Sequence, residues 1–221
     1  MVIRGANLVD GTGAPARTAD VGIDDGVIRA VGRVGSGHRV IDADGLLLTP
    51  GFVDIHTHYD AQVTWDERLA PSSDHGVTTV VMGNCGVGFA PVAPDRHDWL
   101  IGLMEGVEDI PGAALAEGIE WKWETFGEYL DSLDGKARAC DFGTQLPHGA
   151  LRAYVMGERG ANNEDATEED IEQMYRLTKE ALEAGALGFS TSRTPLHKSI
   201  DGVPVPGTFA ATAELRGIGR A

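Results

Sequence analysis

Two histidines separated by one residue are the sharpest chemical signal in this sequence. His56 and His58 lie at the end of the apolar run FVDIHTH, residues 52–58. On a β-strand, residues i and i+2 point to the same face, so both imidazoles can converge on one metal ion or reach two adjacent ions. Asp54 lies two residues earlier on that face. Taken alone, the pair is equally compatible with a polar, hydrogen-bonded loop.

A cysteine follows the next apolar run. Cys85 lies in VVMGNCGVG, residues 80–88, where Gly83 and Gly86 let the backbone turn sharply around it. A thiolate is a strong ligand for Zn²⁺ and can bridge two ions. An isolated cysteine is more often a small buried hydrophobic residue. Its expected position at the same rim as the histidines favours a metal site made of His56, His58 and Cys85.

The other histidines carry weaker signals. His148 follows the third predicted strand, and two interpretations are open for it: a site-facing role and a structural hydrogen bond. His197 could border a substrate pocket, but an ordinary loop histidine is the favoured interpretation. Solvated or locally bonded side chains are expected at His38, His75 and His97. The alternating Trp121 and Trp123 are interpreted as packing residues.

The elements that must position these residues fall into two parts. Residues 1–50 contain short strands, and Asp-Gly pairs that favour chain reversal lie at 10–11, 25–26 and 44–45. After Pro50-Gly51, apolar strand-like runs alternate with helix-compatible stretches, a pattern typical of a parallel α/β sheet. These runs cover residues 52–58, 77–85, 140–146 and 185–192. Active sites of parallel α/β barrels lie at the carboxyl ends of the strands.

Three helices are expected from local signals. The clearest covers residues 168–184, where Thr167 and Asp170 form a capping box, an apolar stripe repeats at helical spacing, and Gly185 follows the last turn. A second helix is predicted at 125–133, and a third is expected to begin near Ala210.

Composition limits the classes of partner. Lys and Arg number 18 against 34 Asp and Glu, so the formal charge is 18 − 34 = −16, and no basic patch occurs. Nucleic acid and anionic membrane surfaces are therefore excluded as expected partners. The two cysteines are too few for a disulfide framework, and no signal-peptide core or membrane-length apolar run is present. The expected location is cytoplasmic.

Several motifs together resemble a known family. PGFVDIHTHYD at 50–60 is similar to the opening of the amidohydrolase superfamily, and HGVTTVVMGNCGVGFAP at 75–91 resembles its N-acyl-D-amino-acid deacylase (D-aminoacylase) branch. The blocks at 148–152, 180–193 and 205–208 continue the likeness in the same order. The resemblance implies an α/β fold: a small β-sandwich segment at residues 1–50, then the N-terminal half of a metal-dependent (β/α)8 TIM-type barrel at 51–221.

The same resemblance implies a chemistry. His56 and His58 would belong to one metal site, Cys85 would bridge two, and one or two Zn²⁺ ions would serve hydrolysis of the linear amide in N-acyl-D-amino acids. Further zinc-binding histidines and the catalytic aspartate are expected beyond residue 221, so no catalytic residue is expected within this chain. We therefore expect a fragment that is inactive alone, with a complementary C-terminal chain as a possible partner.

Two other functions stay open. A hydantoinase or dihydropyrimidinase acting on cyclic amides would share the His-x-His start. Cys85 argues against this alternative, because those enzymes have a lysine at the bridging position. A non-catalytic zinc-binding fragment or subunit is the second alternative. The sequence leaves acyl and side-chain specificity and oligomeric state undetermined.

Overall fold

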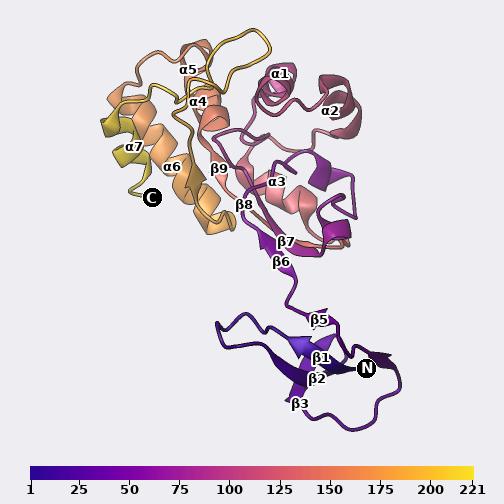
Figure 1. The fold of residues 1–221 in the computed structure, drawn as a ribbon. Coiled ribbons are helices and arrows are strands. Elements are labelled where there is room, and N and C mark those ends of the chain that lie inside the picture. The colour runs from indigo at the N-terminus through magenta and orange to yellow at the C-terminus, as the bar shows by residue number, and fades with distance from the viewer. The chain divides into compact units, whose positions relative to one another are not determined.

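The computed structural model describes all 221 residues as two compact units, Met1–Phe52 and Val53–Ala221 (Figure 1). The first unit contains only strands. The second contains every helix together with the strands that follow Phe52.

A single five-stranded sheet forms the first unit. Its strands are β1 (Val2–Leu8), β2 (Arg17–Asp24), β3 (Val27–Gly32), β4 (Val40–Asp42) and β5 (Leu47–Leu48). The order is β3-β2-β1-β4, with β5 also on β1; β1 pairs antiparallel with β2 and parallel with β4 and β5. Leu8, Ala19 and Val21 form its small core. A sandwich needs a second sheet, which these residues do not supply.

The turn between β2 and β3 shows why Asp-Gly pairs were informative. Asp25 and Gly26 have φ angles of 48° and 72°. Two consecutive residues with positive φ match the right-handed twist of a hairpin, and Gly tolerates this region without steric cost. The reversal predicted at 25–26 is confirmed.

Short strands and intervening helices build the second unit. A three-stranded sheet has the order β6 (Phe52–Asp54), β7 (Val77–Met82), β8 (Asp141–Thr144), and β7 and β8 run parallel. A second, parallel pair joins β9 (Leu146–Pro147) to β10 (Phe189–Ser190). The strands thus alternate with helices along the chain, as the apolar runs predicted.

Each predicted strand is longer than the strand observed. The runs expected at 52–58 and 77–85 end as strands at Asp54 and Met82, so the histidines and the cysteine lie in the turns that follow. The run at 140–146 is divided between β8 and β9, and that at 185–192 shrinks to β10. Asp54 does not share a strand face with the histidines, because it is the last residue of β6 and they lie beyond it; its carboxylate accepts a hydrogen bond from the backbone N–H of His56 (3.2 Å). An apolar run therefore predicts where a strand lies better than it predicts how long that strand is.

Seven helices surround these strands. They are α1 (His97–Glu108), α2 (Gly112–Gly118), α3 (Phe126–Leu133), α4 (His148–Met156), α5 (Glu158–Ala161), α6 (Glu168–Ala184) and α7 (Thr212–Ile218); two 3₁₀ turns, η1 (Gln62–Thr64) and η2 (Ser73–His75), precede β7. Helix α6 has the predicted bounds and the predicted Thr167–Asp170 capping box. Helix α3 matches its prediction within one residue, with a second capping box from Thr125 and Glu128. Helices α4, α6 and α7 lie side by side in Figure 1.

One contiguous apolar core holds the second unit together. Met82 of β7, Leu103 of α1, Leu151 of α4 and Met174 of α6 are among its members, each at most 2% exposed. Burying a side chain of this size stabilises a fold by about 1.5–3 kcal/mol. None of the helices combines the length and apolar character needed to cross a bilayer.

Candidate metal centre

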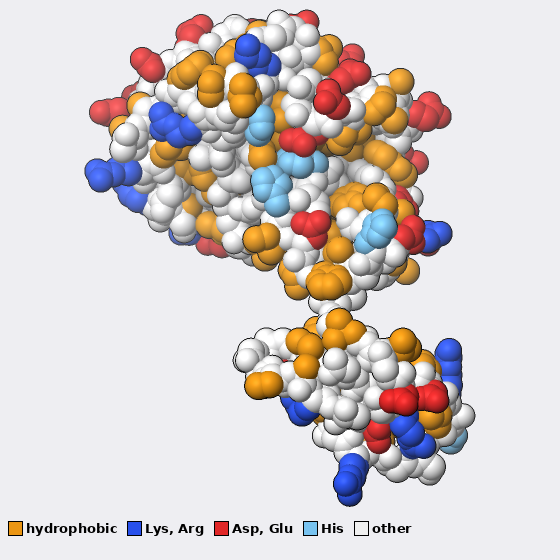
Figure 2. All heavy atoms as spheres, in the orientation of Figure 1, with side chains coloured by type: hydrophobic (Ala, Val, Ile, Leu, Met, Phe, Trp, Pro, Cys, Tyr) orange, Lys and Arg blue, Asp and Glu red, His pale blue; other side chains and the backbone are white.

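His56, His58 and Cys85 come together at the ends of β6 and β7. One potential ligand atom from each lies within 4.8 Å of the other two, and His56 Nε2 is 3.1 Å from Cys85 Sγ. The two imidazole rings are 5.4 Å apart between centroids. Figure 2 shows histidine side chains gathered on one face of the second unit beside an acidic side chain. The three residues that the sequence singled out are therefore neighbours in space.

His58 is held in its neutral form with one ring nitrogen unused. Burial, with the nearby His56 and His197, lowers its pKa to about 4. Nε2 lies 3.2 Å from Glu108 Oε1, at the end of α1, whereas the buried Nδ1 has no hydrogen-bond partner. A neutral imidazole offers a lone pair to a metal ion. Buried polar atoms are usually hydrogen-bonded, so the orphaned nitrogen indicates a partner from outside the chain.

The turn that carries Cys85 is fixed from both sides. Cys85 has a φ of 55°, an uncommon conformation for a residue with a side chain. The hydroxyl of Ser190, on β10, accepts a hydrogen bond from Gly86 N (3.1 Å) and donates one to Gly83 O. One side chain thereby spans the turn and holds the thiol in place.

A buried amide joins the cysteine turn to the histidine turn. Asn84 Nδ2 donates to Thr57 O (3.2 Å), the carbonyl between the two histidines, and to Val81 O (2.9 Å). Its Oδ1 accepts from Gln145 Nε2 (2.8 Å). Thr57 N also donates to Val81 O (2.9 Å). The relative position of the ligand atoms is therefore set by hydrogen bonds as well as by the strands.

Acidic groups near the thiol were not singled out from the sequence. Burial, followed by the charges of Glu108 and Asp60, raises the pKa of Cys85. Asp60 is itself buried, and this raises its pKa to about 7. Its position two residues after His58 was a usable signal. Glu108 had none, because its helix begins at His97 and the preceding N-cap residue, Arg96, makes no side-chain cap.

The donor set fits a zinc ion. Two imidazoles and one thiol are the donor types that Zn²⁺ prefers, and soft thiolate ligands are poor partners for Mg²⁺ and Ca²⁺. The orphaned Nδ1 of His58 leaves room for a ligand from outside the chain without identifying it. Three protein donors leave one position of a tetrahedral ion free for water or substrate, or for a further protein ligand.

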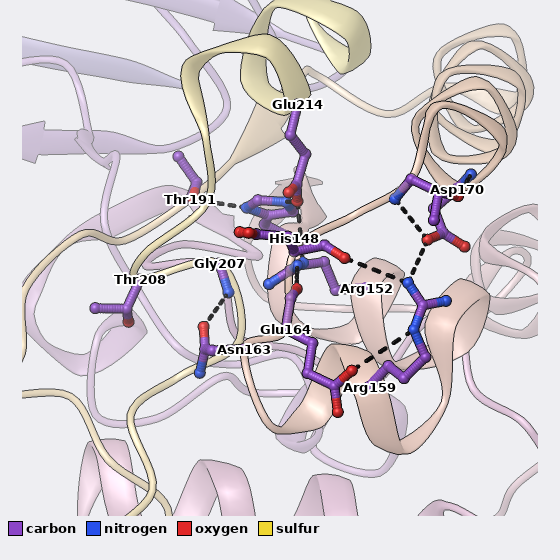
Figure 3. Close-up of polar contacts among 12 residues, drawn as sticks. His148, Arg152, Arg159, Asn163, Glu164, Asp170, Thr191, Gly207, Thr208 and Glu214 are labelled. Carbon is purple, nitrogen blue, oxygen red and sulfur yellow. Dashed lines mark hydrogen bonds and ion pairs between the residues drawn. The ribbon is translucent and has the colours of Figure 1, made fainter.

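His148 belongs to a separate, buried network in which both of its ring nitrogens have protein partners (Figure 3). Its side chain is completely buried, with Nδ1 2.9 Å from Thr191 Oγ1 and Nε2 2.8 Å from Glu214 Oε1. Arg152 Nε also lies 3.0 Å from Glu214 Oε1, in the geometry of an ion pair rather than of a linear hydrogen bond. Burial lowers the pKa of His148. Both ring nitrogens have protein partners, which matches the structural-hydrogen-bond interpretation; the site-facing role stays a prediction.

The remaining histidines and tryptophans also have structural surroundings. His97 stacks on Trp121, with ring centroids 4.0 Å apart and planes 2° from parallel, and Trp123 Nε1 donates to Phe89 O (2.8 Å). The packing interpretation of the tryptophans is confirmed. His38 and His75 are exposed. His197 Nδ1 lies 3.3 Å from Ser192 Oγ.

Comparison with known proteins identifies the family. The sequence profile described as "Amidohydrolase family" matches residues 39–220, most of the chain. The chain belongs to the amidohydrolase family. It is 35% identical to D-aminoacylase of Alcaligenes xylosoxydans xylosoxydans, over 86% of this chain and 37% of that protein. It is 36% identical to N-acyl-D-aspartate deacylase of the same organism, over 86% of this chain and 36% of the relative.

Solved structures agree on the fold of this amidohydrolase chain. It matches the crystal structure of D-aminoacylase with a TM-score of 0.79 and 34% identity, over 99% of this chain and 42% of that one. It matches N-acyl-D-glutamate deacylase of Bordetella bronchiseptica, solved with zinc and a phosphonate inhibitor, with a TM-score of 0.73 and 33% identity. The predicted α/β class, part of an amidohydrolase barrel preceded by a small β segment, is confirmed. The chain spans less than half the length of these relatives.

Proposed function

We propose that this chain carries part of the zinc site of an amidohydrolase that hydrolyses the linear amide of N-acyl-D-amino acids to a carboxylate and a D-amino acid. The observation that carries the proposal is the approach of the His56, His58 and Cys85 ligand atoms to within 4.8 Å of one another in a chain of this family. The names of the relatives, D-aminoacylase and N-acyl-D-aspartate deacylase, support the substrate class.

Each of the three residues has a defined part in this proposal. His56 and His58 supply neutral nitrogen donors, and the low pKa of His58 keeps it neutral throughout the physiological range. Cys85 supplies a thiolate that can bridge two ions, and its raised pKa means that binding an ion releases the thiol proton. A bound zinc ion lowers the pKa of its water and polarises the acyl carbonyl. A structure of D-aminoacylase is described as having a binuclear metal centre, which supports one or two ions here.

The remaining zinc-binding and catalytic residues of the proposed enzyme are not assigned in this chain. The resemblance implies further zinc-binding histidines and a catalytic aspartate, and we assign no residue of 1–221 to those roles. We propose that the chain alone is weakly active or inactive and that a complementary C-terminal segment or chain completes the site. A zinc-binding fragment without turnover is the second candidate, favoured by the partial coverage of the relatives. The cytoplasmic location stays a prediction.

Metal content and deacylase activity of the chain and its Cys85→Ala variant test the proposal. Cys140→Ala is the matched control, because Cys140 is the other free cysteine and lies outside the cluster. We expect the chain and the control to retain zinc, and the Cys85 variant to lose it. Hydrolysis of N-acetyl-D-amino acids at enzyme-like rates by the chain alone would contradict its incompleteness. Equal zinc content in all three proteins would remove Cys85 from the site.

A further inference from the structure

A small hairpin beyond β10 reaches back toward the metal centre. Lys198 and Pro204 form an antiparallel bridge, Ser199 N donates to Val203 O (2.8 Å), and Val205 N donates to His197 O (3.1 Å). These bonds give residues 197–205 a defined backbone. His197 stands at the start of this hairpin, so its position is fixed by the bonds around it.

The hairpin lies directly on helix α1. Ile200 N donates to Gly102 O (3.2 Å), and a Cβ added at Gly106 would come within 2.3 Å of the Ser199 carbonyl carbon. Only a residue without a side chain permits this approach. Two residues further along the same helix, Glu108 contacts His58. The hairpin and His58 are therefore positioned by one helix turn.

A second anchor fixes His197 from the side of Cys85. A Cβ on Gly86, the residue after Cys85, would lie 3.3 Å from Ser192 N. Ser192 Oγ in turn lies 3.3 Å from His197 Nδ1. His197 is thus linked through Ser192 to the turn that carries Cys85, and through its hairpin to the helix that carries Glu108.

One side of the His197 ring is free for a ligand. Nε2 makes no hydrogen bond, and the side chain is half-buried. When Nδ1 accepts a hydrogen bond from the Ser192 hydroxyl, Nε2 carries the proton and is a donor. His197 lies outside the group of three whose ligand atoms approach within 4.8 Å, so it is placed to meet a molecule beside the ion rather than the ion itself.

Unpaired positive charge flanks this histidine. Arg193 and Lys198 form no side-chain hydrogen bond or ion pair, whereas most basic side chains of the second unit do. The chain as a whole carries a net charge of −16, so acidic partners are abundant elsewhere. Two exposed cations without partners and a histidine ring nitrogen without a hydrogen bond, close together in sequence, fit an anionic group on the substrate.

We propose that the 193–198 segment binds the substrate carboxylate, with His197 Nε2 donating a hydrogen bond to one carboxylate oxygen while Arg193 and Lys198 supply the surrounding positive field. The inference rests on the proposed function and deepens it. It makes the carboxylate of an N-acyl amino acid, rather than its acyl chain, the group that this segment recognises.

Binding of an acid and its neutral amide separates this role from a structural one. N-acetyl-D-leucine and N-acetyl-D-leucinamide are titrated calorimetrically into the zinc-loaded chain, its His197→Gln variant, and His75→Gln, a matched control at an exposed histidine. We expect His197→Gln to weaken binding of the acid about tenfold or more, as for a lost hydrogen bond to a charged group, and to leave the amide unchanged. Arg193→Gln and Lys198→Gln should each have smaller, salt-sensitive effects.

The outcomes distinguish the two proposals. If the unaltered chain binds the acid but His197→Gln changes neither compound, or both equally, the carboxylate subsite is wrong and the proposed function stands. Loss of zinc from His197→Gln would make the residue a metal ligand and also overturn the subsite. If the unaltered chain retains zinc but binds neither compound, residues 193–198 do not bind the carboxylate and the subsite is overturned, whereas the proposed zinc site stands.

Discussion

Two histidine-containing regions of the second unit contrast sharply in whether the ring nitrogens of their buried histidines have protein partners. In the network around His148, both ring nitrogens have partners, and Glu214 and Arg152 are each 1% exposed. In the candidate metal centre, His56 is exposed and His58 Nδ1 is buried without a partner, and in the hairpin at residues 197–205 the Nε2 atom of His197 makes no hydrogen bond. Both regions follow the ends of short strands, so location alone does not separate them.

This difference separates polar clusters that stabilise the fold from polar clusters that are available to bind a ligand. A buried charged group is tolerated only when it is paired, and breaking such a pair is strongly destabilising. Donor atoms left unbonded cost free energy that a bound ion or substrate can recover. We therefore expect substitutions in the network to act on stability and those in the metal centre to act on binding.

Glu214→Gln should cause the largest loss of stability. The carboxylate contacts His148 and Arg152 without solvent around it, so its neutralisation leaves a buried guanidinium uncompensated. We expect the free energy of unfolding in urea to fall by about 3–5 kcal/mol. Asp74→Asn, which breaks the exposed Arg68–Asp74 pair, is the control and should change it by less than about 1 kcal/mol. Equal losses of unfolding free energy in the two variants would show that the buried network stabilises the fold no more than an exposed ion pair does.

Asn84→Ala should cause an intermediate loss of stability. It should also weaken metal binding, because this buried amide supports the metal centre itself. Its removal leaves the Gln145 amide and the Thr57 carbonyl without their partners. We expect a loss of about 1–3 kcal/mol in the metal-free chain, together with weaker zinc binding in a chelator competition. Gln173→Ala removes an exposed helical amide and should alter neither quantity. Unchanged zinc affinity would mean that the strands alone position the ligands.

The loss of stability caused by Ser190→Ala should be smaller still. The hydroxyl bonds on both sides of Cys85, so its loss frees the turn without emptying the core. We expect about 1 kcal/mol of destabilisation and a weakened thiolate-to-metal charge-transfer band when cobalt replaces zinc. Ser190→Thr keeps the hydroxyl and should restore the band. A band of full intensity in Ser190→Ala would show that the turn needs no such support.

Local patterns predicted the elements that depend on local interactions. Helix α6 has its predicted bounds because Thr167, Asp170 and Gly185 terminate it through bonds to their near neighbours in sequence. The His56, His58 and Cys85 cluster was predicted because successive strands of a parallel sheet end at one rim.

Such local patterns could not predict interactions between residues that are distant in the sequence. His148 and Glu214 are 66 positions apart, and nothing near either residue indicates the other. The strands were predicted too long, because an apolar run does not reveal where backbone pairing stops. His197 was interpreted as an ordinary loop residue that could also border a substrate pocket. The hairpin that begins at His197 lies on α1 because Gly106 admits its backbone, and nothing near His197 in the sequence indicates that contact.

His56→Ala should have the smallest effect on the metal-free chain and therefore tests the comparison most directly. The side chain is exposed and packs against little, so we expect the free energy of unfolding without metal to change by less than about 0.5 kcal/mol. The proposed function has zinc bind the folded state through this residue, and a concentration 100 times the dissociation constant should then stabilise the unaltered chain by about 2.7 kcal/mol. The variant should lose most of that increment in urea titrations with and without zinc. If it is destabilised without metal as strongly as Glu214→Gln, the free donor atoms of the metal centre are part of the fold, and the distinction between the two regions fails.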